Sequence, residues 1–352
     1  MQALAPTDIQ QLEAFFAAAK RVSIAVHTHP DGDAIGSGAA LLGYLRQSRG
    51  LDARLLLPEA GPASLDFAMP ADGWIDATRE PDAARAWIAG SDLLVCLDMN
   101  AFNRTEALAP ALAASKARKV LIDHHLHPDS DAFDLVFSET GISSTCELLF
   151  WVLLALPGVG EAARLPMPVL DALMTGMTTD TNNFANSVFP STLQMASELL
   201  AAGVDRNALL GQLYQNYREN RFRAMGAALA ERMVVRPDGV AYIILDKVFL
   251  QRFDLQEGET EGFVNLPLGI GAVRMSLLLR EDEGHFRVSI RSKAGVSANR
   301  LAADAFHGGG HTCAAGGKLF FPQDIPTPAA AGEYIATVTA RFMRDQAPSL
   351  SE

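Results

Sequence analysis

The amino-acid sequence predicts an α/β protein in which a doubly wound, mainly parallel sheet is joined by helices to a smaller α+β domain. Short apolar runs alternate with amphipathic helical stretches through the first half of the chain, as in sheets covered by helices on both faces. A second group of strand patterns begins only after a long helical stretch. We therefore expect a first domain over residues 1–190, a helical connector over 191–232 and a second domain over 233–345, with the chain fraying beyond it.

The first domain is expected to consist of short apolar strands and the helices between them. The strand patterns cover residues 21–27, 53–57, 92–98 and 119–123. The helical patterns cover residues 36–47, 81–89 and 143–156, and an amphipathic helix is expected within residues 1–20. Ligands of such sheets bind beyond the carboxyl ends of the strands, so charged side chains at those ends are candidate site residues.

The second half of the chain begins with the helical stretch over residues 191–232, which fits a hinge between domains or the contact surface of a homodimer. The strand patterns after it cover residues 240–245, 273–279 and 285–291. A helix is expected over residues 298–306, and a glycine-rich loop follows it.

The composition indicates a globular protein, with 49% hydrophobic and 20% charged residues. Its net charge of −12 argues against binding to long duplex nucleic acid through an overall positive field. Residues 1–200 hold 12 Lys and Arg against 24 Asp and Glu, whereas residues 201–352 hold 17 of each. An acidic first half suits cations, and the arginines of the second half suit an anion. With three scattered cysteines and no long apolar segment, we expect a cytoplasmic protein that does not bind membranes.

The densest group of charged side chains is His27-Thr-His-Pro-Asp31-Gly-Asp33, which lies between the first expected strand and the next helix. Three candidate ligands at the end of one strand would converge on one or two divalent ions. An Asp-Gly-Asp turn that caps a helix has the same pattern, so this motif alone does not decide between the two interpretations.

Three further motifs place acidic residues or histidines after apolar segments. Asp98 ends the third expected strand, where a cap or turn is its ordinary role. Asp123, His124 and His125 follow the fourth strand directly, and adjacent imidazoles behind a buried strand need polar partners. Asp180 follows the apolar segment 173–177.

The second half carries a different group, which suits an anion. Its members are Arg291, Ser292, Asn299, Gly308, Gly309, Gly310 and His311. Consecutive glycines expose backbone N–H groups and allow an anion to approach closely, while Arg291 and His311 would add charge-assisted hydrogen bonds to a phosphate. Asn299 would contact a base or ribose edge, or else cap a helix.

Taken together and in this order, the motifs resemble those of the DHH phosphoesterase superfamily, which is named for the triplet Asp123–His125. The residues from Arg291 onward resemble the DHH-associated C-terminal domain, and Arg104 matches a further position of the superfamily. The resemblance spans roughly residues 20–320 and is closest to the nanoRNase branch. One departure is Asn182, where relatives often have Gly. It leaves open which backbone conformation the motif around Asp180 adopts.

The resemblance implies a centre with two divalent ions. The first ion would be held by His27, Asp31 and Asp98, and the second by Asp33, Asp98, His124 and Asp180. Carboxylates and imidazoles together favour Mn²⁺, with Mg²⁺ and Co²⁺ as alternatives. By the same resemblance, Asp98 bridges the ions, His125 contacts the phosphate or protonates the leaving group, and Asp123 orients His124.

The expected activity is the hydrolysis of very short oligoribonucleotides to mononucleotides, of 3′-phosphoadenosine 5′-phosphate to AMP, or of both. The site would lie in a cleft between the domains. Arg104, His125 and the second-half group would bind the substrate, a nucleotide or short single-stranded RNA. Two alternatives stay open. One is a phosphodiesterase for cyclic or linear signalling dinucleotides, and the other is a nucleotide-binding protein without catalytic activity.

Overall fold

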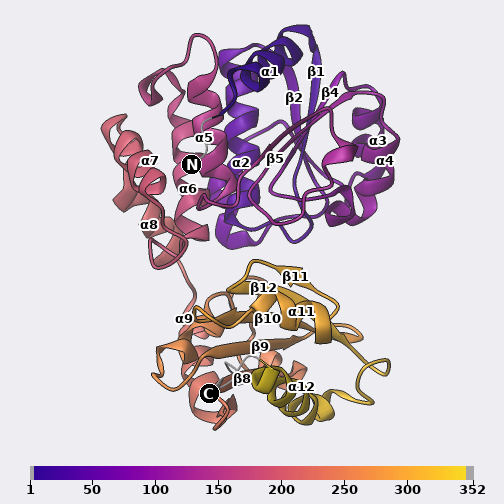
Figure 1. The fold of residues 1–352 in the computed structure, drawn as a ribbon, viewed down its shortest axis with the longest axis vertical. Coiled ribbons are helices and arrows are strands. Elements are labelled where there is room, and N and C mark those ends of the chain that lie inside the picture. Colours follow the sequence, from indigo (N-terminus) through magenta and orange to yellow (C-terminus); the bar gives the residue numbers. More distant parts are fainter. Residues whose placement is uncertain (1–3, 346–352) are drawn as a thin grey trace, which may run out of the picture. The chain divides into compact units, whose positions relative to one another are not determined.

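The computed structural model describes residues 4–345 and divides the chain into two compact units, the first ending at Asn216 and the second beginning at Tyr217 (Figure 1). The helices expected to form a separate connector over residues 191–232 are instead divided between these units. Helices α7 (Pro190–Ala201) and α8 (Arg206–Tyr214) belong to the first unit, because Met195 and Leu199 pack into its core. The fraying expected beyond residue 345 concerns residues outside the described part of the chain.

The first unit is built on a six-stranded parallel sheet with the strand order β3-β2-β1-β4-β5-β6. Its strands are β1 (Arg21–Ala25), β2 (Asp52–Leu57), β3 (Trp74–Asp76), β4 (Leu93–Leu97), β5 (Arg118–Asp123) and β6 (Leu135–Ser138). This order confirms the doubly wound sheet, and it reverses between β1 and β4. The sequence did not indicate β3 and β6, because runs of three and four residues are too short to show a period.

Helices cover both faces of this sheet (Figure 1). They are α1 (Pro6–Ala18), α2 (Gly32–Gly43), α3 (Pro81–Ala89), α4 (Ala109–Ala114), α5 (Thr145–Ala155) and α6 (Met167–Asp180), together with α7 and α8. Every residue of β4 is buried, with Val95 packed in the core that contains α2, α5 and α6, and Cys96 in the core that contains α3 and α4. Burial on both faces explains why the strands read as continuous apolar runs.

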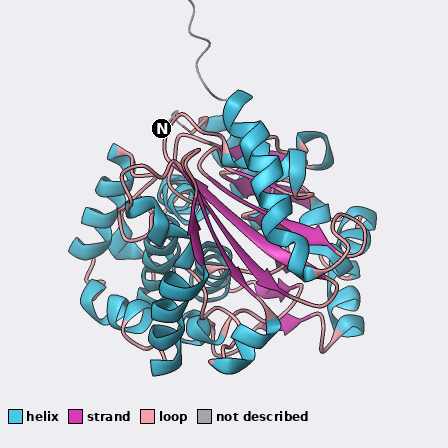
Figure 2. Cartoon of the chain, turned by 90° about the horizontal axis from the view of Figure 1, so that it is seen from below, coloured by secondary structure: helices cyan, strands magenta, loops and turns pink. Residues whose placement is uncertain are grey.

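The second unit confirms the smaller α+β domain and contains a mixed sheet with the order β11-β12-β10-β9-β8-β7. Its strands are β7 (Met233–Val235), β8 (Val240–Leu245), β9 (Met275–Glu281), β10 (His285–Ser292), β11 (Gly309–Gly310) and β12 (Ala314–Phe320). Its helices are α9 (Glu219–Ala227), α10 (Lys247–Arg252), α11 (Ala298–Ala305) and α12 (Ala331–Asp345). Helices α11 and α12 pack in one core of this unit, and α9 and α10 pack in another. Figure 2 shows helices beside the strands of the chain.

Buried and partly exposed residues alternate strictly along strand β10, so the strand presents different side chains on the two faces of the sheet. Phe286, Val288 and Ile290 are buried in the core with α11 and α12. The residues between them, His285, Arg287, Ser289 and Arg291, therefore lie on the opposite face of the sheet. Among the helices of residues 4–345, none has both the length and the apolar character needed to cross a bilayer.

Candidate functional site

The candidate metal ligands gather at the carboxyl ends of β1, β4 and β5, where the strand order of the sheet reverses. Asp98 comes directly after β4 and is 2% exposed, and its backbone N–H donates to the carbonyl of Ile122 at 3.2 Å. Its φ is 58°, in the left-handed region that non-glycine residues rarely occupy. A strained backbone at a buried acid is typical of a functional site, because the surrounding structure has to hold it in place.

The loop from His27 to Asp33 serves both as a helix cap and as a source of ligands. Asp31 is the N-cap of α2, and its Oδ1 accepts from the backbone N–H groups of Asp33 at 3.0 Å and Ala34 at 3.1 Å. The cap therefore accounts for one oxygen of Asp31. It also starts α2 at Gly32, which places Asp33 fully buried in the first helical turn.

Two groups of potential ligand atoms share the surroundings of Asp98. In the first, His27 Nε2 lies 3.3 Å from Asp98 Oδ2 and 3.8 Å from Asp31 Oδ1. In the second, His124 Nε2 lies 3.3 Å from Asp180 Oδ2 and 3.9 Å from Asp33 Oδ2. Within each group the ligand atoms all lie within 4.8 Å of one another.

Asp98 lies between the two groups. Its Oδ2 faces His27, while its Oδ1 lies 3.5 Å from His124 Nε2. The structure thus brings together all six residues that the sequence indicated as metal ligands. Asp180 reaches the second group from the last residue of helix α6, although the sequence pattern assigned it to no element.

The electrostatics of this cluster fit a cation. Burial and the charge of Asp98 raise the pKa of Asp33 to about 7, and burial and the charge of Asp33 raise the pKa of Asp180 well above its usual value. Burial lowers the pKa of His27 and His124, but Asp98 outweighs it and raises these pKa values to about 9 and about 10. Negative charge is therefore crowded into a buried volume, and a donor set of carboxylates and imidazoles there can hold divalent metal ions.

A segment that the sequence analysis did not single out as functional positions two of these acids. Asp33 Oδ2 accepts from the backbone N–H of Thr145 at 2.7 Å, and Asp33 Oδ1 accepts from that of Cys146 at 2.9 Å. The hydroxyl of Thr145 donates to Asp98 Oδ1 at 3.1 Å. The available signal was the helix start, since Ser144 accepts from the backbone N–H of Glu147 in a Ser-x-x-Glu pattern.

The expectation that Asp123 orients His124 is wrong. The hydrogen bond that the structure gives Asp123 joins its Oδ1 to Nδ1 of His125 at 2.7 Å. His125 Nδ1 also lies 3.6 Å from Asp98 Oδ1. The two residues of the Asp-x-His pair project to the same side of the chain after β5, so Asp123 orients the His125 ring beside the candidate ligands.

The two remaining positions of the first unit also lie near this cluster. Arg104 is in the short helix η3 (Phe102–Leu108), its carbonyl accepts from the backbone N–H of Thr28 at 2.8 Å, and its charge acts to lower the pKa of His27. Asn182 has a φ of 46°. Because Asn tolerates the left-handed region better than most residues, it adopts a conformation that glycine also favours.

Glu59, which is not one of the candidate ligands, holds the loop from His27 to Asp33 in place. Its Oε1 accepts from the hydroxyl of Thr28 at 2.7 Å and from the backbone N–H of His29 at 2.6 Å, and it lies 2.7 Å from Nδ1 of His29. His29 thus contacts Glu59, and its φ of 52° lies in the left-handed region. The hydrogen bond to His29 is the main cause that lowers the pKa of Glu59 to about 2.

Replacing Glu59 by Gln should lower the free energy of unfolding by about 1 kcal/mol at pH 7, allowing for solvent screening of a partly exposed group. The folded pKa of about 2 lies below the ordinary value of 4.5, so the stabilisation is complete above pH 4.5 and is lost as the pH falls toward 2. Denaturant titrations of both proteins in chelator at pH 7 and pH 3 measure this. A difference as large at pH 3 as at pH 7 would contradict the prediction.

In the second unit, some of the residues that the sequence indicated as anion-binding make hydrogen bonds to neighbouring residues. The hydroxyl of Ser292 donates to the carbonyl of Val296 at 2.6 Å, and Ser292 is 8% exposed. Asn299 Oδ1 accepts from the hydroxyl of Ser297 at 2.5 Å and from the backbone N–H of Arg300 at 2.9 Å. Asn299 is the second residue of α11, whose N-cap is Ser297, so it does not cap that helix. Arg291 lies on β10, beside Ala314 of β12.

Two backbone N–H groups at the glycine loop donate to carbonyl groups of the second unit. The N–H of Gly308 donates to Ala302 at 3.0 Å, and the N–H of His311 donates to Ala314 at 2.7 Å. A Cβ on Gly308 would lie 1.9 Å from the carbonyl oxygen of Gly316, and Gly310 has a φ of 134°. The glycines allow β11 to approach β12 closely. This packing sets the position of the His311 backbone, which directly follows β11.

Comparisons with known proteins agree with this arrangement. The chain matches the model of the DHH family, N-terminal domain, over residues 21–177, and that of the DHHA1 domain over residues 240–327. The chain is similar to the bifunctional oligoribonuclease and PAP phosphatase NrnA of Thermus thermophilus, with 32% identity over 85% of this chain and 84% of that protein. The protein of the same name from Bacillus subtilis is 27% identical over 84% and 88%. The crystal structure of an exopolyphosphatase-related protein from Bacteroides fragilis matches with a TM-score of 0.90 and 34% identity, over 98% and 99% of the two chains.

Proposed function

Because the chain belongs to the DHH family, we propose that it is a two-metal phosphoesterase that hydrolyses very short oligoribonucleotides to mononucleotides and 3′-phosphoadenosine 5′-phosphate to AMP. The observation that carries this proposal is the pair of ligand groups that share Asp98. Relatives named oligoribonuclease and PAP phosphatase, similar over most of the chain, support the choice of substrates.

The ligand sets follow from the two groups of atoms. One ion would be held by His27, Asp31 and Asp98, and the other by Asp33, Asp98, His124 and Asp180. Two divalent ions, of which Mn²⁺ fits this mixture of carboxylate and imidazole best, would neutralise charge on the attacked phosphate and on the leaving oxygen. The amides of Thr145 and Cys146 keep the Asp33 carboxylate in one orientation.

The other residues of the site bind the substrate and move a proton. His125, held by Asp123 at 2.7 Å, would donate a proton to the leaving oxygen or contact the phosphate. Arg104 would contact the same phosphate. In the second unit, Arg291 and His311 would bind the terminal phosphate, so that short chains with a free end are the preferred substrates.

The test measures hydrolysis of a 5′-phosphorylated trinucleotide and of 3′-phosphoadenosine 5′-phosphate with Mn²⁺, Mg²⁺ or Co²⁺ and with chelator. We expect mononucleotides from the first substrate and AMP from the second. Both activities should be lost in chelator and restored by Mn²⁺. Turnover that persists in chelator would contradict the metal mechanism. Inactivity on both substrates with all three ions would contradict the proposed function and make signalling dinucleotides the next substrates to examine.

A further inference from the structure

One face of the sheet in the second unit carries a row of cations that the proposed contacts at Arg291 and His311 do not use. Arg287 in the middle of β10 lies directly opposite Arg280 of β9 on one side and Lys318 of β12 on the other. Directly opposed residues of neighbouring strands point to the same face, and like charges there destabilise the sheet. The row therefore needs an anionic partner.

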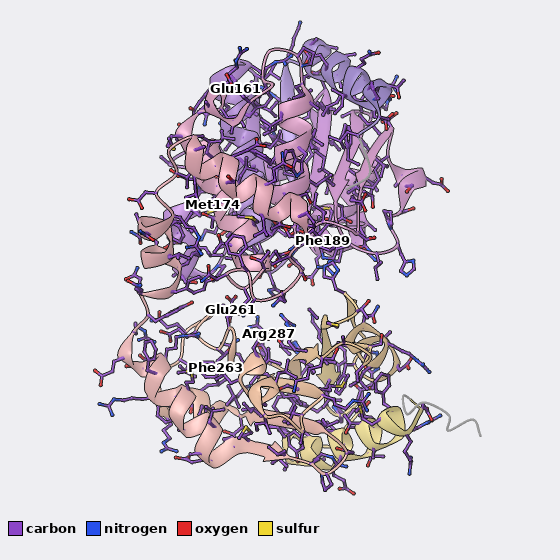
Figure 3. The ribbon with its side chains drawn as sticks, turned by 60° about the vertical axis from the view of Figure 1, so that its left-hand side comes forward. Glu161, Met174, Phe189, Glu261, Phe263 and Arg287 are labelled. Atoms are coloured by element: carbon purple, nitrogen blue, oxygen red, sulfur yellow. The ribbon has the colours of Figure 1, made fainter. Side chains whose placement is uncertain are left out.

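In this structure the carboxylate of Glu257 takes that position, and a second carboxylate, Asp282 Oδ2, lies 3.1 Å from Nε of Arg287. Glu257 Oε1 lies 2.7 Å from Nη1 of Arg287, and Glu257 Oε2 lies 2.8 Å from Nη2 of Arg287 and 2.7 Å from Nη1 of Arg280. The paired contacts are the arrangement in which Arg also binds phosphate. The Glu257 side chain is 57% exposed, so little besides the two arginines fixes it. Figure 3 shows Arg287 beside the segment that carries Glu261 and Phe263.

Aromatic rings lie next to the cation row on the same face. His285 pairs with Phe320 in the strand register, and their ring centroids are 5.5 Å apart at an angle of 35°. The ring of His307 meets Phe320 edge-on, also at 5.5 Å. Phe320 and His285 are half-buried and His307 is exposed. Accessible rings beside cations are the combination that binds single-stranded nucleic acid, because bases stack on the rings while the cations contact the backbone.

The remaining register pairs connect this region to Arg291. Going along β10, Arg291 lies opposite Ala314, Ser289 lies opposite Gly316, and the cation row follows. Gly316 is exposed, whereas Leu278, opposite Ser289 on β9, is 5% exposed and packs with Phe263. The accessible path between the two arginines therefore runs along β12. Four residues of strand separate Arg291 from Arg287, which is about 14 Å at about 3.4 Å per residue. A mononucleotide with its phosphate at Arg291 would not span that separation, whereas a short oligonucleotide would.

We propose that this face is a second nucleotide subsite, in which Arg280, Arg287 and Lys318 receive a later phosphate of the oligonucleotide and the rings around Phe320 stack on its base. The inference rests on the proposed function, since it takes the terminal phosphate to be bound at Arg291. The incoming phosphate replaces the Glu257 carboxylate between the arginines. The subsite contributes to the binding of trinucleotides and longer chains, and it does not contribute to the binding of 3′-phosphoadenosine 5′-phosphate.

The test compares KM for a 5′-phosphorylated trinucleotide and for 3′-phosphoadenosine 5′-phosphate in Mn²⁺. Arg287→Gln and Phe320→Leu should each raise KM for the trinucleotide about tenfold and leave KM for the mononucleotide within about twofold. Glu257→Gln should lower KM for the trinucleotide, because it removes the competing carboxylate. Arg252→Gln is the matched control, since Arg252 holds Glu231 in a similar two-point contact elsewhere in this unit and should change neither value.

Equal changes of KM for both substrates with Arg287→Gln, or no change for either, would overturn the subsite. A higher KM for the trinucleotide with Glu257→Gln would overturn the competition by the carboxylate. Lys318→Gln gives the same readout if Arg287→Gln does not fold, as judged by its thermal midpoint. In all these cases the wild type still hydrolyses both substrates. Wild-type inactivity on both would instead contradict the proposed function.

Discussion

Replacing Asp98 by Asn should lower kcat on both substrates by about three orders of magnitude or more, because the substitution removes a charge from both ligand groups at once. Asp98 Oδ2 faces His27 and Asp98 Oδ1 faces His124, so no other acid can take over both contacts. The variant should still fold. Asn has nearly the shape of Asp and adopts a left-handed φ at least as readily, which the value of 58° at this position requires.

Two measurements separate loss of metal from loss of structure. The rise in thermal midpoint that Mn²⁺ gives the wild type should disappear in Asp98→Asn, while the midpoints in chelator stay close. Asp92→Asn is the matched control from the opposite end of the same strand, where the carboxylate accepts from the backbone N–H groups of Lys20 and Arg21. It should keep full activity. A kcat within about tenfold of wild type for Asp98→Asn would refute the shared role of this acid.

The position of the candidate site could be predicted because it follows from sheet topology. The motifs at His27, Asp98 and Asp123 each come directly after an apolar run, and the carboxyl ends of parallel strands meet at one edge. The strands themselves were recognisable because burial on both faces makes them continuously apolar. That reasoning needs only the order of elements along the chain, which the sequence contains.

Contacts that depend on side-chain direction could not be predicted in the same way. The amides of Thr145 and Cys146 reach Asp33 across more than 110 positions of sequence, and only the packing of α5 against α2 brings them together. Asp123 could face either neighbouring histidine until the backbone after β5 was known. The role of the glycine loop could not be decided from the sequence, because a glycine that avoids a steric clash and a glycine that exposes its N–H have the same sequence signature.

Close packing of α2 against α6 is the structural condition for the second ligand group. Asp33 lies in the first turn of α2 and Asp180 is the last residue of α6, so the separation of these helices sets the separation of the two acids. Glycines permit the contact. A Cβ on Gly36 would lie 2.6 Å from the carbonyl oxygen of Ala172, and a Cβ on Gly32 would lie 2.4 Å from Oγ1 of Thr179.

Gly176, the one glycine of α6, faces the candidate metal ligands. A Cβ there would lie 2.2 Å from Sγ of Cys146, 2.8 Å from Oδ1 of Asp33 and 3.0 Å from Cα of Asp33. Gly176→Ala should therefore lower the free energy of unfolding by about 2 kcal/mol, despite the higher helix propensity of Ala. It should also weaken Mn²⁺ binding, because the methyl group pushes Asp33 away from His124 and Asp180.

Denaturant titrations and Mn²⁺ titrations of the thermal midpoint measure the two effects. Gly211→Ala, in α8, is the control, because a Cβ there meets no heavy atom of the described residues within 4 Å. It should raise stability by up to about 1 kcal/mol. In a Cys146→Ala background the cost of Gly176→Ala should be smaller, since the 2.2 Å contact is gone, and the remaining cost measures the conflict with Asp33 alone. If Gly176→Ala matched Gly211→Ala in stability and kept Mn²⁺ affinity, the separation of α2 and α6 would not control the second ligand group.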